Sequence, residues 1–280
     1  MRTLSVATLV FLLVAGSALA QPAFPLKYKF HKGDTYRYAD TLVVQTTQEM
    51  MGQEMKMSQD IAAITRFVVD GLTSDGGANL ITSSDTMRIN AKNARMDTTI
   101  VPVELIHKRN RLTMTTLGVI TAREVIDSVK ASLLMRGSGG IASREILRLP
   151  VLSAKPVKAG DKWTSTKVDS TKSDGGSSVL KTTMEYTLVG REKYAGRGCI
   201  KLAYTGKLEV NTKGTMMGMD VFTEGTGAMT GVVFFDDNAG IFVGDEGKTD
   251  MEMTAAVTGQ QNMTIPITSS TKMKHVLLTD

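Results

Sequence analysis

The sequence predicts a mainly β, single-domain protein in which a curved antiparallel sheet, a half-barrel, packs against one main helix. Two observations predict the sheet: Thr- and Val-rich stretches alternate apolar and polar residues, and Gly, Asp and Asn interrupt them where turns are needed. A third observation predicts the helix, because one central segment carries apolar residues at helical spacing. Most of the chain is therefore expected to be strand.

The first 20 residues have the pattern of a cleaved secretory signal peptide. Arg2 precedes an apolar run from Leu4 to Val14, and small residues precede a cut after Ala20. That run is shorter than the roughly 20 apolar residues of a membrane-spanning helix. A lipoprotein signal needs a Cys at the cut, and the single Cys is Cys199. We expect residues 21–280 to be periplasmic or secreted, without a lipid anchor.

Charge and composition argue against a nucleic-acid partner. Removal of Arg2 with the signal peptide lowers the net charge from +5 to +4, the basic residues are scattered, and aromatic residues make up 5% of the chain. The one basic cluster, His107–Arg111, is interpreted as a solvated turn. The rest of the chain has no apolar segment long enough to form a transmembrane helix, and its oligomeric state has no signature in the sequence.

Strands are predicted on both sides of the chain's middle. Tyr36–Val44, Ala62–Val69 and Ala78–Ser84 alternate in the first half. In the second half, two apolar runs flank Asp236–Ala239. This polar stretch is followed by Gly240, which indicates a tight hairpin. The paired aspartates are interpreted as turn residues in preference to a calcium or acid–base site.

The predicted helical segment covers residues 121–148. Thr121 and Glu124 have the spacing of a capping box, and Gly137 supplies a helix end. The apolar residues on one face of this helix are Ala122, Val125, Ile126, Val129 and Leu133.

The segment joins two halves, about 26–118 and 155–280, that look related. Gly33-Asp34 and Gly160-Asp161 each form a turn signal that leads into a strand starting with an aromatic residue. The predicted domain is thus one mainly β unit with a possible internal duplication.

The motif Pro156-Val157-Lys158-Ala159-Gly160-Asp161-Lys162-Trp163 resembles a family of bacterial exported proteins of unassigned function. The strand with Gly225-Thr226-Gly227 and the turn Phe235–Gly240 also look like the LolA/LppX-type half-barrel. This resemblance implies a helix packed on the concave side of the sheet and a hydrophobic-ligand cavity between them. It implies no catalytic residue.

The chain contains 18 methionines, many of them on alternate positions of predicted hairpins. Thioether side chains adapt to acyl chains and other irregular apolar shapes. They also bind Cu(I), and they serve equally well as core residues in place of Leu. The candidate ligand contacts are Met50, Met55, Met57, Met217 and Met219, together with Ile126, Val129 and Leu133 of the predicted helix.

Catalytic signatures are missing from the sequence. His31, His107 and His275 lie far apart and belong to no metal-binding or nucleophile motif. We therefore expect a non-catalytic exported protein without a cofactor, which binds or carries a hydrophobic small molecule or lipid. A structural or interaction role in the cell envelope is the first alternative, and Met-based Cu(I) binding is the second.

Overall fold

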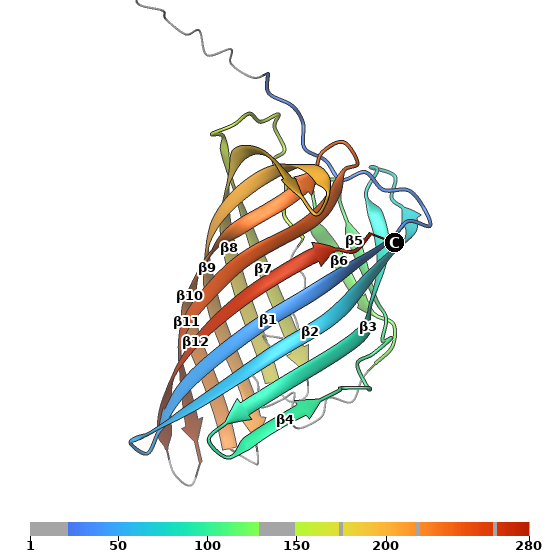
Figure 1. Ribbon diagram of the computed structural model, residues 1–280. Helices are drawn as coiled ribbons and strands as arrows, with labels where there is room; N and C mark the ends of the chain where they lie inside the picture. Colours follow the sequence, from blue (N-terminus) through green and yellow to red (C-terminus); the bar gives the residue numbers. More distant parts are fainter. Residues whose placement is uncertain (1–21, 129–148, 174–175, 217–218, 260–261, 280) are drawn as a thin grey trace, which may run out of the picture.

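The computed structural model describes residues 22–128, 149–173, 176–216, 219–259 and 262–279, which form one antiparallel sheet of 12 strands (Figure 1). The order across the sheet is β6-β5-β3-β2-β1-β12-β11-β10-β9-β8-β7, with β4 paired to β3. The strands are β1 (Thr35–Met50), β2 (Gln53–Leu72), β3 (Ala78–Asn93), β4 (Met96–Ile100), β5 (Asn110–Met114), β6 (Ile120–Val125), β7 (Lys162–Ser173), β8 (Gly176–Tyr194), β9 (Arg197–Met216), β10 (Met219–Asp236), β11 (Ile241–Thr258) and β12 (Met263–Leu277).

The sheet curls so that β1 and β2 lie in front of β7, β8 and β9 in Figure 1. A single strand pair, β1 with β12, joins the six N-terminal strands to the six C-terminal strands. Most neighbouring strands are hairpins with tight turns. At the β1–β2 turn, Met51 and Gly52 both have positive φ, 52° and 74°, which matches the right-handed twist of the strands that they connect.

Alternation along the strands gives the sheet a charged outer face. Cross-strand ion pairs on this face join Lys181 to Glu209 at 3.0 Å and Lys274 to Glu246 at 2.7 Å. Such exposed pairs contribute at most about 1 kcal/mol each. Their main consequence is a surface suited to contact with water.

The inner face carries the hydrophobic core at the upper end of Figure 1. The segment before β1 and the segment before β7 pack there, with Leu26, Tyr28 and Leu152 buried against Phe235 and Phe242. Tyr28 also donates a hydrogen bond to the Pro150 carbonyl at 3.0 Å. The two irregular segments thus close the upper end of the curled sheet, where the space left between Tyr28, Phe67 and Phe242 is only about 20 Å³.

The prediction of a main helix packed on the sheet is wrong for the described residues, which form strands and contain no helix. Thr121–Val125, where we expected the first helical turn, belongs to β6 (Ile120–Val125), which pairs with β5. Glu124 is not part of a capping box: its carboxylate accepts a hydrogen bond from Arg111 of β5 at 2.6 Å. Cross-strand pairing therefore outweighed a local helix signal.

Residues 129–148, the remainder of the predicted helix, lie outside the described part of the chain, as do the signal peptide and its cut after Ala20. Within the described ranges, no helix has the length and apolar character needed to cross a bilayer.

Candidate functional site

The inner face continues below the core as a broad lining that we call the concave lining. It consists of the inward-facing residues of β1, β2 and β8–β12 from the level of Thr249 to the lower end of the sheet. One cross-strand row of this lining reads Thr182, Leu208, Gly227, Met251, Ser269, Thr46 and Met57. The row below it reads Leu180, Val210, Gly225, Met253, Ile267, Gln48 and Met55.

Glycines in the concave lining are covered by methionines of neighbouring strands. A Cβ at Gly227 would lie 2.8 Å from the Met251 side chain, and one at Gly225 would lie 2.5 Å from the Met253 side chain. These methionines therefore lie flat along the sheet, across the space that a larger residue would fill. The wall stays thin there; Met251 is buried, and Met253 is partly exposed on the surface of the lining.

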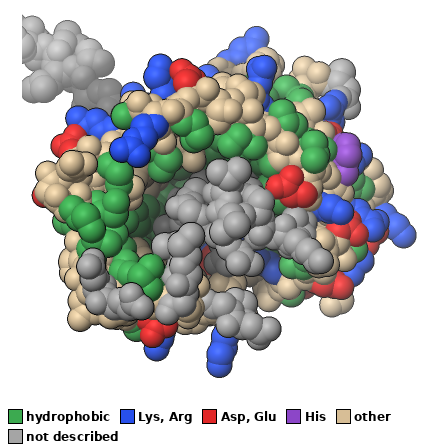
Figure 2. All heavy atoms as spheres, turned by 90° about the horizontal axis from the view of Figure 1, so that it is seen from below, with side chains coloured by type: hydrophobic (Ala, Val, Ile, Leu, Met, Phe, Trp, Pro, Cys, Tyr) green, Lys and Arg blue, Asp and Glu red, His purple; other side chains and the backbone are tan. Residues whose placement is uncertain are grey.

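The concave lining carries no charged residue among the described positions of β1, β2 and β8–β12. The outer face of the same strands alternates Lys, Glu and Asp with Thr, in a chain in which 22% of residues are charged. Several lining side chains remain half-exposed, including Val44, Met57, Met253 and Ile267. Figure 2 views the lower end, where hydrophobic side chains gather beside a hollow. An uncharged, partly exposed inner surface is suited to an apolar molecule.

Four of the five methionines expected to contact a ligand lie at this lower end. Met50 on β1, Met55 and Met57 on β2, and Met219 on β10 all belong to the inward-facing set. Ile126 instead lies in a bend just after β6. The other expected contacts, Met217, Val129 and Leu133, fall outside the described residues.

A row of buried ionisable groups crosses the inner face just above the concave lining. Asp40 of β1 lies opposite His275 of β12, which lies opposite Asp245 of β11. His275 Nδ1 contacts the Asp245 carboxylate, and the Thr65 hydroxyl donates to Asp40 Oδ2 at 2.5 Å. The exposed fractions of the three ionisable residues are 3% or less.

Burial raises the pKa of Asp40 to about 7, although His275 and Thr65 lower it in part. Sequence reasoning missed this row because it judged the histidines by their separation along the chain. A usable signal was present: Asp40 falls in the inward phase of the alternation, between Tyr38 and Leu42.

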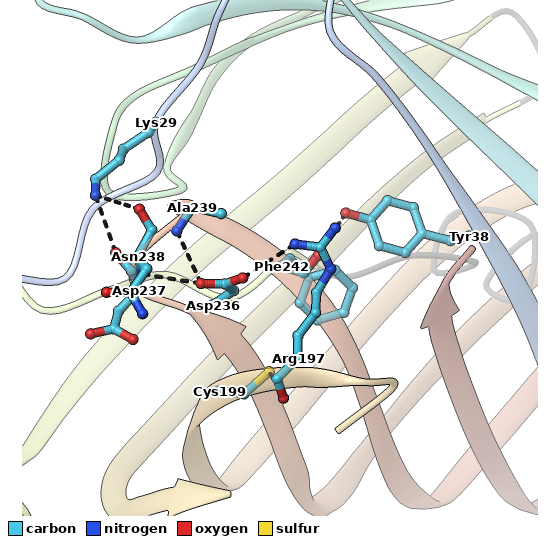
Figure 3. A network of polar contacts seen from close by, with 9 residues as sticks. All are labelled: Lys29, Tyr38, Arg197, Cys199, Asp236, Asp237, Asn238, Ala239 and Phe242. Carbon is cyan, nitrogen blue, oxygen red and sulfur yellow. Dashed lines mark hydrogen bonds and ion pairs between the residues drawn. The ribbon is translucent and has the colours of Figure 1, made fainter. Parts of the chain in front are cut away.

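A second polar network lies at the upper end of the sheet, at the β10–β11 turn (Figure 3). The Asp236 carboxylate accepts hydrogen bonds from the backbone N–H groups of Asn238 and Ala239 at 3.1 and 3.0 Å, and it pairs with Arg197 at 3.3 Å. Lys29 donates to the Asn238 carbonyl at 2.7 Å. These contacts hold the β10–β11 turn in place, as the turn interpretation of the paired aspartates predicted.

Metal and surface sites have less support from the geometry. Within the described residues, no group of three or more His, Cys, Asp or Glu side chains is arranged to hold a metal ion. An open groove of about 630 Å³ follows the free edge of β7 beside Trp163, and its lining includes Lys155, Asp161 and Lys162. The groove also has apolar residues in its lining, such as Leu117, Val119 and Val157, but its three charged residues make it a poorer match for an apolar molecule than the concave lining.

Comparison with known proteins adds no family. No family model and no curated protein matches the chain. Among solved structures, an outer membrane channel from Pseudomonas putida F1 is 8% identical with a TM-score of 0.20 over 90% of this chain and 97% of that one. OpdQ from Pseudomonas aeruginosa is 8% identical with a TM-score of 0.22 over 88% and 99%. TM-scores this low do not establish a shared fold, and nothing about function is carried over.

Proposed function

We propose that this protein is an exported, non-catalytic binding or carrier protein whose concave lining holds a hydrophobic ligand. The observation that carries the proposal is the contrast between the two faces of the same strands. The outer face is charged and suited to water, whereas the inner face below the core is uncharged and keeps apolar side chains half-exposed. Each 100 Å² of apolar surface that a ligand removed from water there would contribute roughly 2.5 kcal/mol before the costs of binding.

Methionine is well suited to this role. Its unbranched thioether chain adapts to ligands of different shape, and in this protein methionines cover Gly225 and Gly227, with Met253 over Gly225 partly exposed. Copper binding and a purely structural role stay predictions, since no contact among the described residues favours either of them. The periplasmic or secreted location is part of the proposal and rests on the signal peptide predicted at residues 1–20.

The first test is recovery of the ligand. Residues 21–280 are expressed with their leader, purified from the periplasm without detergent, and examined by native mass spectrometry and organic extraction. A co-purifying apolar molecule is the expected result. In parallel, the extracted protein is titrated with N-phenyl-1-naphthylamine, an uncharged fluorophore that brightens in apolar sites. Empty extracts together with no fluorescence enhancement would exclude the carrier function.

Two neighbouring residues of β12 provide a matched pair of variants. Ile267 is half-buried in the concave lining, and Thr268 is exposed on the outer face. Ile267→Lys places a charge against the bound fluorophore and should weaken binding at least 10-fold. Thr268→Lys adds the same charge to the outside and should change the affinity less than 2-fold. Circular dichroism and thermal melts confirm that both variants are folded, and equal affinities would place the fluorophore elsewhere.

A further inference from the structure

The concave lining has two chemically different walls. On β8–β10 the two rows given above are mostly aliphatic or Gly, with Leu180, Leu208 and Val210 buried. On β12, β1 and β2 the same rows and the row above them mix the apolar Val44, Met55, Met57 and Ile267 with neutral hydrogen-bonding side chains, namely Thr271, Ser269, Thr46, Gln48 and Gln59. A molecule that fills this space thus meets mostly hydrocarbon on one side, and apolar side chains interspersed with uncharged polar groups on the other.

Thr249 of β11 stands at the boundary between these walls. Its neighbours in the row are Met229 of β10 and Thr271 of β12. The residue is 4% exposed, and its hydroxyl has no hydrogen-bond partner among the described residues. An unpaired buried hydroxyl costs roughly 1–3 kcal/mol, so the fold is destabilised at this point unless a ligand provides the partner.

Charges around the lining disfavour an ionic ligand. On the inner face of these strands the nearest ionisable groups belong to the buried row above the lining, with Asp245 four residues before Thr249, Asp40 four residues before Val44, and His275 between them. Four residues of strand span about 13 Å. A carboxylate or phosphate on the ligand would therefore be buried without a counter-charge and would face two carboxyl groups. A buried ammonium group would also lack a contact partner.

We infer that the ligand is a neutral amphiphile: its hydrocarbon chain packs on the β8–β10 wall, and an uncharged oxygen-bearing group, such as a hydroxyl or an ester, hydrogen-bonds to Thr249. This inference rests on the proposed function and adds the chemical class of the ligand and one specificity-determining residue. Thr249 favours ligands that carry an oxygen at its position along the lining. The lack of charged side chains in the lining disfavours ligands with ionic headgroups.

The test compares four probes that share one pyrene-labelled alkyl chain and differ at its end: a monoacylglycerol, a free carboxylate, a primary amine and a plain hydrocarbon. Binding is followed by pyrene fluorescence at fixed ionic strength. The monoacylglycerol should bind at least 10-fold more tightly than the carboxylate and the amine. A carboxylate or amine that binds as tightly as the monoacylglycerol would overturn the inference.

Thr249→Val removes the hydroxyl and keeps the shape of the side chain. It should weaken binding of the monoacylglycerol 5- to 20-fold and leave binding of the hydrocarbon probe unchanged, a selectivity that a merely structural role would not produce. Thr254→Val, on the outer face of the same strand, is the matched control and should affect neither probe.

The thermal midpoint of the Thr249→Val variant without ligand should be no lower than that of the parent, since an unpaired hydroxyl is lost. Unchanged monoacylglycerol binding in this variant would refute the role of Thr249 and leave the carrier function standing. Failure of all four probes, the hydrocarbon included, would remove the carrier function itself.

Discussion

Replacing Asp40 with Asn should change how the stability of this protein depends on pH. Asp40 is 2% exposed on the inner face of β1, and its Oδ1 atom has no hydrogen-bond partner among the described residues. Burial raises its pKa from the ordinary value of 3.8 to about 7. An Asn side chain has the same shape and can still accept the hydrogen bond from Thr65, but it does not ionise.

The sign of the effect follows from linkage. Between pH 3.8 and about 7 the Asp40 carboxyl ionises in the unfolded chain and stays protonated in the folded protein, so rising pH favours unfolding. Its contribution to stability is complete below pH 3.8, falls across this window and becomes constant above about pH 7. Since each pH unit in the window contributes about 1.4 kcal/mol, the loss is on the order of 4 kcal/mol.

The assay is urea unfolding of the parent and the Asp40→Asn variant at pH values from 4 to 8. Groups that do not interact with Asp40 cancel in the difference between the two free energies of unfolding, whereas the neighbours His275 and Asp245 contribute to it together with Asp40. As the pH rises, the parent should lose several kcal/mol of stability relative to the Asp40→Asn variant. Asp97→Asn is the control, because it removes an exposed carboxyl that pairs with Lys92 and lies outside the buried row; its difference should vary with pH less than that of Asp40→Asn. A difference for Asp40→Asn that stays constant within about 0.5 kcal/mol would refute the reasoning.

Three further outcomes are expected. A methyl group at Gly231 would lie 2.5 Å from the Tyr204 hydroxyl and 2.4 Å from a backbone carbonyl of β11. Gly231→Ala should therefore lower the free energy of unfolding, measured by urea denaturation, by about 2 kcal/mol. An unchanged urea midpoint would contradict this contact. Burial raises the pKa of the Cys199 thiol, so a thiol reagent should modify it slowly in the native protein at pH 8 and rapidly in denaturant; fast native labelling would show an accessible thiolate. Asp236→Ala leaves Arg197 and two turn N–H groups without their acceptor. It should lower the free energy of unfolding, measured by thermal melts, by about 2–3 kcal/mol. A loss below about 0.5 kcal/mol would mean that the turn forms without this carboxylate.

Alternation and turn residues predicted the strands well because both signals are local. Tyr36–Val44 and Ala62–Val69 lie within β1 and β2, and the turn at Asp236–Gly240 joins β10 to β11. The helix prediction failed for a reason that is not local. Thr121–Val125 matches a helix start, but these residues form β6, where the edge of β5 offers a partner and Arg111 pairs with Glu124.

The candidate site was predictable only in part. Alternation in β2 places Met55 and Met57 on one face, and the structure shows that this is the inner face. No pattern in the sequence indicates that Thr249 lies between Met229 and Thr271, because that placement depends on the register of β10, β11 and β12. Register follows from the turns and from burial of one whole face, so it is settled by pairing across the sheet.

By itself the sequence determined the strand content, the turn positions and the apolar character of one strand face, because backbone preference and period-two alternation are properties of short segments. Only the tertiary structure decided that β1 pairs with β12, which brings Asp40, His275 and Asp245 into one buried row although up to 235 positions separate them along the chain. It also decided that the uncharged faces of seven strands meet in one concave lining. Both outcomes arise from long-range strand pairing, whose partners no local pattern specifies.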